Sequence, residues 1–197
     1  ADQAGKFRSY FERMKKLLEE ESEFVPVAAA DSDEDDRKIE ELTRMQYNTF
    51  RAILTNKRVH IKGVAGSGKT VIATWGANAL ADEGKKVLYL CYNNLLASWM
   101  NHQKSNKNKF EIHSFFSFCK KTVEAKGMIF QQKPDENDFY EKRAVDLTLD
   151  AIEKMSENEK YDAIFVDEAQ DFQSDWWFVV ESLLKDGADN HLYLFYD

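Results

Sequence analysis

Residues 63–70 (GVAGSGKT) set three glycines, a lysine and a threonine at the spacing of a phosphate-binding P-loop. They follow an alternating, strand-like run at 58–62 and precede a helix-like run at 71–75, the context that a P-loop requires. Glycine lets the backbone approach a phosphate closely, so that successive N–H groups point at it. The positive end of the helix dipole acts on the same point. The pattern therefore predicts a nucleotide site, and a plain glycine-rich turn is the alternative.

Each residue type in this loop suits one part of a magnesium nucleotide. We expect Lys69 to reach the β- and γ-phosphates of ATP and to act in catalysis, and the Thr70 hydroxyl to ligate Mg²⁺. ATP and Mg²⁺ are thus the predicted cofactors. The remaining cofactor-binding positions of the loop are expected to be Gly63, Ala65, Gly66, Ser67 and Gly68.

A pair of carboxylates, Asp167 and Glu168, follows the apolar run 163–166. Two adjacent charges at the end of a buried strand are costly unless a cation compensates them, and the pattern matches a Walker B segment. We expect Asp167 to hold Mg²⁺ directly or through water, and Glu168 to orient and deprotonate the attacking water. The alternative is a solvent-facing acidic turn.

Around these motifs, strand-like and helix-like segments alternate. This alternation predicts an α/β fold with a doubly wound, mostly parallel sheet and helices on both faces. Such folds bind ligands at the carboxyl ends of their strands, where both motifs are expected to lie. Strands are expected at 58–62, 87–92, 110–113, 162–168 and 192–197, and helices at 6–23, 36–54, 69–83, 95–104, 114–126, 137–158 and 174–185.

Length and composition indicate a compact protein. With 197 residues, 43% of them hydrophobic, the chain suits one domain with at most a small appendage. It has no apolar run near the roughly 18 residues of a membrane span, and no signal-peptide pattern. Cys91 and Cys119 lie in apolar surroundings, which favours buried free thiols over a disulfide or a metal site. We expect a monomeric, cytoplasmic protein that does not contact a membrane.

The net charge of −8 combines a basic middle with acidic ends. Residues 85–126 carry 8 basic and 2 acidic side chains, whereas residues 127–197 carry 6 basic and 18 acidic ones. A basic segment within an acidic protein is a candidate surface for a polyanion such as nucleic acid. An ordinary solvated lysine face is the alternative.

Residues 167–171 (DEAQD) resemble the D-E-x-Q-D box of superfamily 1 helicases of the UvrD/Rep type. Residues 63–70 are similar to the G-x-A-G-S-G-K-T motif of the same family. The resemblance covers residues 42–197. Three weaker matches occur in the family's order, namely Gln46 at an adenine-reading glutamine, residues 90–97 (LCYNNLLA) at motif Ia, and residues 112–115 (IHSF) at a T-H-x-F element.

This resemblance implies the first RecA-like, ATP-binding domain of a DNA helicase, which couples ATP hydrolysis to movement on single-stranded DNA. It implies that Gln46 reads adenine and that Gln170, within the box, belongs to the catalytic set. Motif Ia and the T-H-x-F element contact single-stranded DNA in the family, and RNA is the less favoured partner. The nucleic-acid contacts implied by these two elements are Tyr92, Asn93, His113 and Phe115, and the basic segment 85–126 is expected to add phosphate contacts from Lys107 and Lys109. Trp99, like Tyr92, His113 and Phe115, is expected to stack on bases, and core packing is the alternative for Phe115 and for Trp99.

The sequence departs from the UvrD/Rep pattern in two places. Only about 45 residues separate Phe115 from Tyr161, where well-known members insert a larger domain, and the chain ends at Asp197, where the family's next motif begins. We therefore expect a helix and an acidic linker over 1–36, and a truncated RecA-like domain over 37–197 with a small helical insertion at 115–160. The expected partner is a second RecA-like domain, without which activity is weak. A P-loop switch or regulatory module without unwinding activity is the alternative.

Overall fold

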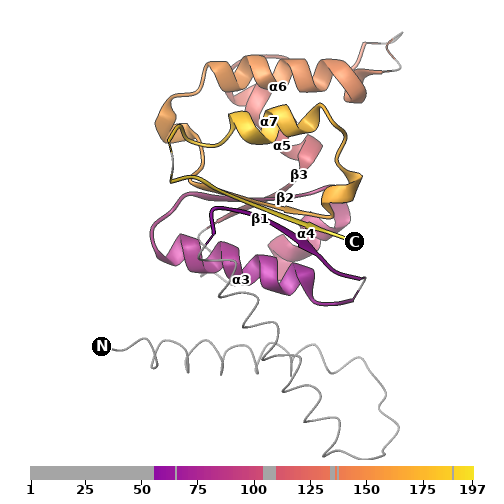
Figure 1. Cartoon of the computed structure of the whole chain (residues 1–197). Coiled ribbons are helices and arrows are strands. Elements are labelled where there is room, and N and C mark those ends of the chain that lie inside the picture. The colour runs from indigo at the N-terminus through magenta and orange to yellow at the C-terminus, as the bar shows by residue number, and fades with distance from the viewer. Residues whose placement is uncertain (1–55, 65, 104–109, 134–135, 137, 188) are drawn as a thin grey trace, which may run out of the picture. The chain divides into compact units, whose positions relative to one another are not determined.

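Five parallel strands form the central sheet of the protein (Figure 1), whose computed structural model describes residues 56–197 except 65, 104–109, 134–135, 137 and 188. Their order across the sheet is β1-β5-β4-β2-β3, and every neighbouring pair is parallel. The strands are β1 (Arg58–Lys62), β2 (Val87–Cys91), β3 (Glu111–Ser114), β4 (Ala163–Asp167) and β5 (His191–Tyr196).

Helices cover both faces of this sheet (Figure 1). One face packs against α3 (Lys69–Asp82) and α4 (Asn94–Gln103). The other packs against α5 (Phe115–Ala125), α6 (Ala144–Glu153) and α7 (Trp176–Ser182). The predicted α/β, RecA-like fold with a parallel sheet and helices on both faces is confirmed. Within the described residues, no helix is both long and apolar enough to span a membrane.

The two central strands, β2 and β4, are continuous apolar segments because helices cover both of their sides. All five residues of β2 (VLYLC) and all five of β4 (AIFVD) are buried, as is usual for strands inside a parallel sheet. In contrast, β1 lies at the edge and alternates exposed and half-buried side chains. The strand that ends in Asp167 is therefore fixed on both faces by the core.

Both cysteines are free and buried, as the sequence predicted. Burial raises the pKa of the Cys91 thiol to about 12, with a further contribution from the charge of Asp167. Burial also raises the pKa of Cys119 to about 12. Neither thiol is ionised near neutral pH, so both act as small apolar side chains of the core.

The expected helix over 137–158 is confirmed over residues 139–153 and is wrong beyond them. The structure has a π-helical turn, η2 (Phe139–Arg143), followed by α6, and α6 ends at Glu153. A separate 3₁₀ turn, η3 (Glu157–Glu159), begins after a capping box in which the Ser156 N–H donates to Glu159 Oε2 at 2.8 Å. The other expected elements within the described residues agree to within three residues. The expected helices at 6–23 and 36–54 lie outside those residues.

Helix α3 makes a close contact with β4 at Gly76. A Cβ placed on Gly76 would lie 2.6 Å from Cε1 of Phe165, whereas packed carbon atoms stay about 3.5–4.0 Å apart. We therefore expect Gly76→Val to lower the free energy of unfolding by about 1–3 kcal/mol, although valine favours a helix more than glycine does. Urea unfolding followed by circular dichroism measures this change.

The matched control is Ala79→Val, which introduces the same side chain at a half-buried position of the same helix. This control is expected to cost only about 0.5 kcal/mol of helix propensity. If Gly76→Val unfolded at the same urea concentration as the wild type, the contact between α3 and β4 would not limit the size of residue 76.

Candidate functional site

The loop between β1 and α3 is a tight turn that ends at a helix N-terminus. Gly66 and Gly68 have left-handed backbone angles, with φ of 77° and 84°, which glycine adopts without the strain that a Cβ adds. The Ser67 N–H donates to the Val64 carbonyl at 3.1 Å, and α3 starts at Lys69 directly after Gly68. The positive end of the α3 dipole therefore lies at this loop, where it favours an anion.

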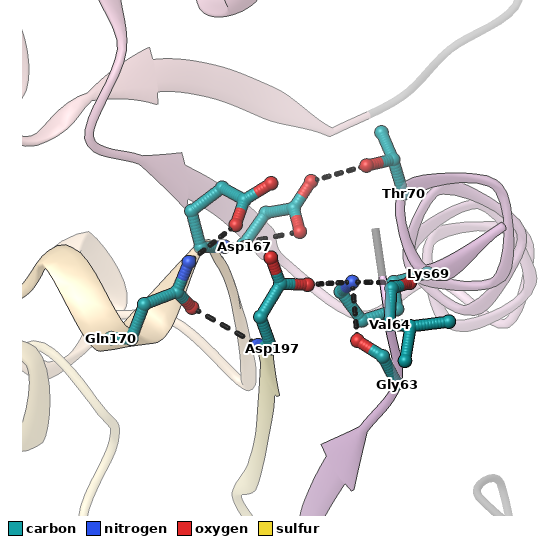
Figure 2. A network of polar contacts seen from close by, with 8 residues as sticks. Gly63, Val64, Lys69, Thr70, Asp167, Gln170 and Asp197 are labelled. Carbon is teal, nitrogen blue, oxygen red and sulfur yellow. Dashed lines mark hydrogen bonds and ion pairs between the residues drawn. The ribbon is translucent and has the colours of Figure 1, made fainter. Parts of the chain in front are cut away.

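Lys69 reaches back over the loop (Figure 2). Its Nζ donates to the Gly63 carbonyl at 2.8 Å and to the Val64 carbonyl at 3.2 Å. It also forms an ion pair with the carboxylate of Asp197, which follows β5. Because only 8% of the Lys69 side chain is exposed, the ammonium is held in a largely buried position between the ends of two neighbouring strands.

Asp167 is a fully buried carboxylate at the end of β4. The Thr70 hydroxyl donates to its Oδ2 at 2.8 Å, and the Tyr89 hydroxyl donates to the same oxygen at 2.7 Å. The Glu168 backbone N–H donates to Oδ1 at 3.1 Å. The fold thus brings a P-loop hydroxyl and a carboxylate from distant parts of the sequence into direct contact (Figure 2).

Thr70 and Asp167 fit a magnesium ion by the chemistry of their donor atoms. Mg²⁺ prefers oxygen ligands, takes only one or two of them from the protein, and completes its shell with water and substrate phosphates. The hydrogen bonds described for Asp167 come from hydroxyl and backbone N–H groups. A buried carboxylate with neutral partners is suited to a cation.

Tyr89 remains a hydrogen-bond donor to this carboxylate. Burial raises the pKa of Tyr89 well above its usual value, and the charge of Asp167 and the hydrogen bond to it raise the pKa further. The tyrosine side chain is fully buried in β2. A protonated hydroxyl therefore faces Asp167 at physiological pH.

Glu168 and Gln170 connect the carboxyl ends of β4 and β5. Glu168 has φ of 53° and is the only residue other than glycine with a positive φ among those that the structure describes. Gln170 Nε2 donates to Glu168 Oε2 at 2.6 Å, and Gln170 Oε1 accepts from the Asp197 N–H at 3.3 Å. Polar contacts thus run from Lys69 through Asp197 and Gln170 to Glu168. Gln46 and Ala65, also predicted for the cofactor site, lie outside the described residues.

Two residues of this arrangement, Asp197 and Tyr89, were not among the predicted site residues. For Asp197, the available signal was a carboxylate directly after an apolar strand, the same pattern that identified Asp167. For Tyr89, the signal was weaker. It is a residue with a polar tip inside an apolar strand, and a buried tyrosine hydroxyl usually finds a hydrogen-bond partner.

Tyr92 and Asn93 follow β2 at the same edge of the sheet. Tyr92 is half exposed, and its ring stacks on buried Trp176 with a centroid separation of 5.9 Å and an interplanar angle of 16°. The Asn93 side chain instead caps the start of α4, because its Oδ1 accepts from the Leu95 N–H at 2.7 Å. Tyr92 therefore has ring surface available to a ligand, while the Asn93 side-chain oxygen already has a partner in the protein.

Phe115 is part of the core. It is fully buried, and its ring stacks on Trp176 at a centroid separation of 4.4 Å. The expectation that Phe115 contacts a base is therefore wrong for this conformation, and the core-packing alternative holds. Trp99 differs, since it is half exposed on α4.

His113 lies on the edge strand β3 within a small polar cluster. Its Nε2 is 3.4 Å from Glu111 Oε2 and 3.3 Å from Lys121 Nζ. The hydrogen bond from His113 and the contacts with Lys121 lower the pKa of Glu111 to about 2, against the opposing effect of burial. His113 thus lies near the end of β3, where its Nε2 already contacts the charged side chains of Glu111 and Lys121. Lys107 and Lys109 lie outside the described residues.

Comparison with known protein families identifies a helicase family. The sequence model of a family described as "Schlafen group 3, DNA/RNA helicase domain" matches residues 56–192, well over half of the chain. This stretch includes the P-loop and the strand that ends in Asp167. No curated protein matches the chain.

Proposed function

The chain belongs to the Schlafen group 3 DNA/RNA helicase domain family, and from this membership we propose that it is the ATP-binding motor domain of a helicase or translocase that moves on single-stranded nucleic acid. Besides this membership, the structural observation that carries the proposal is the meeting of Lys69, Thr70 and Asp167 at the carboxyl ends of the strands. A cation donor, a hydroxyl and a buried carboxylate at a glycine-rich loop form a set suited to a magnesium nucleotide.

Each residue of the set then has a distinct task. Lys69 would give up its contact with Asp197 and donate to the β- and γ-phosphates, and Thr70 and Asp167 would hold Mg²⁺, whose charge would offset that of the phosphates. Glu168 accepts the proton of the attacking water. Gln170, which contacts Glu168 and the Asp197 backbone, transmits changes between the two strand ends.

We further propose that this domain is of the UvrD/Rep type and works with a second RecA-like domain. The support for the type is the box at residues 167–171, together with the loop at residues 63–70. An arginine supplied by a partner domain accelerates related reactions by about 10³–10⁵-fold. Hydrolysis by this chain alone is therefore expected to be slow.

The nucleic-acid surface is proposed to include Tyr92. This residue follows Cys91, which lies opposite Asp167 in the register of β2 and β4. An exposed ring is thus placed beside the strand end that holds the metal ligand, and Trp176 beneath it belongs to α7, just after the acidic box. A base stacked on Tyr92 would lie close enough to the nucleotide site for nucleic-acid binding and nucleotide binding to influence each other.

Tyr92→Ala tests this surface. If a base stacks on the ring, the substitution should weaken single-strand binding by about 1–3 kcal/mol, with little change in the salt dependence that phosphate contacts produce. Fluorescence anisotropy with labelled single-stranded DNA and RNA of equal length, at several salt concentrations, measures both quantities. The same titrations show which of the two nucleic acids the domain prefers.

Phe178→Ala is the matched control, because Phe178 is an exposed aromatic residue on α7 and is not assigned to the surface. It should bind as the wild type does. Equal affinities for Tyr92→Ala and the wild type at every salt concentration would remove Tyr92 from the surface. If the wild-type protein binds ATP but has no salt-sensitive affinity for single-stranded DNA or RNA, this result would instead favour a nucleotide-dependent switch.

A further inference from the structure

Tyr89 reaches Asp167 because of the register between β2 and β4. Residue 89 lies opposite Phe165, and Cys91 lies opposite Asp167, so Tyr89 is two positions back from the carboxylate along the sheet. Positions 89 and 91 share one face of the sheet, the face that packs against α3. Two positions span about 6.6 Å of strand, a distance that the length of a tyrosine side chain covers. The Tyr89 hydroxyl therefore contacts the Asp167 carboxylate within the buried layer between the sheet and α3.

Tyr89 and Thr70 donate to the same oxygen of Asp167 but are anchored differently. Thr70 is half-buried in the first turn of α3, at the loop where a nucleotide is expected. Tyr89 has no exposed surface, and its ring packs against Phe110 at a centroid separation of 6.3 Å. The Thr70 hydroxyl is free to turn from Asp167 toward a metal ion, whereas the buried ring of Tyr89 is held in place. The hydrogen bond from Tyr89 to Asp167 would therefore remain both with and without the metal ion.

We propose that Tyr89 is a positioning residue, which holds the Asp167 carboxylate beside Thr70 so that the two are arranged for Mg²⁺ before the nucleotide arrives. The inference rests on the proposed nucleotide function, since it assigns a role within that site. Magnesium demands nearly ideal octahedral geometry, and partners behind a metal ligand fix its orientation. Loss of such a partner typically reduces metal affinity by about 10–100-fold.

Tyr89→Phe tests the proposal, because it removes the hydroxyl and keeps the buried ring. Binding of a fluorescent ADP to the full chain is measured in excess EDTA and then across a Mg²⁺ titration. The variant should need about 10–100-fold more Mg²⁺ to reach half of the metal-dependent gain in affinity. Its affinity in EDTA should equal that of the wild type, since Asp167 is the residue of the proposed site that Tyr89 contacts within the described part of the chain.

Tyr193→Phe is the matched control. Tyr193 is also fully buried and lies within the same core cluster, on β5 at the other side of β4, but its hydroxyl contacts His191 Nδ1 at 2.9 Å. This variant should bind ADP as the wild type does in both conditions. Asp167→Asn sets the size of the full effect by removing the metal ligand itself, and urea unfolding shows that each variant is folded.

Three results would overturn the inference, and they differ from one another. An unchanged Mg²⁺ requirement in Tyr89→Phe would show that the hydroxyl does not position Asp167. An equal loss in EDTA and in Mg²⁺ would show a structural role of the tyrosine in the core. A wild-type protein that binds no ADP in either condition would overturn the proposed nucleotide function, and this inference with it.

Discussion

Glu168→Gln should lower the rate of ATP hydrolysis by about 10²–10⁴-fold, the usual contribution of a general base. An amide has nearly the shape of the carboxylate and can still accept a hydrogen bond from Gln170, so the local contacts of the strand end are kept. It cannot, however, take a proton from water. Single-turnover hydrolysis at saturating ATP measures the rate, and it detects the slow reaction expected of this chain.

Nucleotide binding separates this effect from a general loss of function. Because Glu168 is expected to touch the attacking water and not the phosphates, the variant should bind ATP with an affinity close to that of the wild type. Asp175→Asn, which changes an exposed carboxylate beyond the acidic box, should hydrolyse ATP at the wild-type rate. Hydrolysis by Glu168→Gln at the wild-type rate would exclude Glu168 as the base.

The contact between Thr70 and Asp167 was predictable because it follows from local patterns and one topological rule. A glycine-rich loop between a strand and a helix and an acidic pair after an apolar strand can both be found in the sequence. Parallel strands then bring their carboxyl ends to one edge of the sheet. The observed distance of 2.8 Å between Thr70 Oγ1 and Asp167 Oδ2 is the result of these features.

The contacts of Tyr89 and Phe115 depend on information that alternation does not contain. Tyr89 reaches Asp167 only because β2 lies next to β4, and the sequence predicts strands without their order. Phe115 follows a strand, as a base-stacking residue does, but Trp176 from α7 covers its ring. An aromatic residue after a strand can belong to the core or bind a ligand, and the composition of its segment does not distinguish the two. The residues packed against its ring decide which role it has.

The error at helix 137–158 has a different cause, since its signal was present in the sequence. Ser156 and Glu159 have the S-x-x-E spacing of a capping box, and the structure forms both of its hydrogen bonds. This local start signal separates η3 from α6. Apolar residues keep helical spacing through residues 137–158, so this spacing alone predicts a helix that continues beyond Glu153, where α6 ends.

Lys69→Ala should weaken ATP binding by about 1.5–3 kcal/mol, which corresponds to roughly 10- to 100-fold in the dissociation constant. The lysine ammonium exchanges the Asp197 carboxylate for phosphate oxygens on binding, so the loss is the difference between two ionic contacts. The substitution leaves no buried unpaired charge, because the Asp197 side chain is 45% exposed. The fold should therefore be retained, which urea unfolding checks.

Isothermal titration calorimetry with ATP and Mg²⁺ measures the loss, and Lys62→Ala is its control. Lys62 is exposed at the end of β1, directly before the loop, so its removal changes the net charge near the site by the same amount. If general attraction of the anion were the cause, both variants would lose affinity equally. A loss confined to Lys69→Ala requires a direct contact with phosphate, whereas equal binding by Lys69→Ala and the wild type would contradict the assignment of this loop as a nucleotide site.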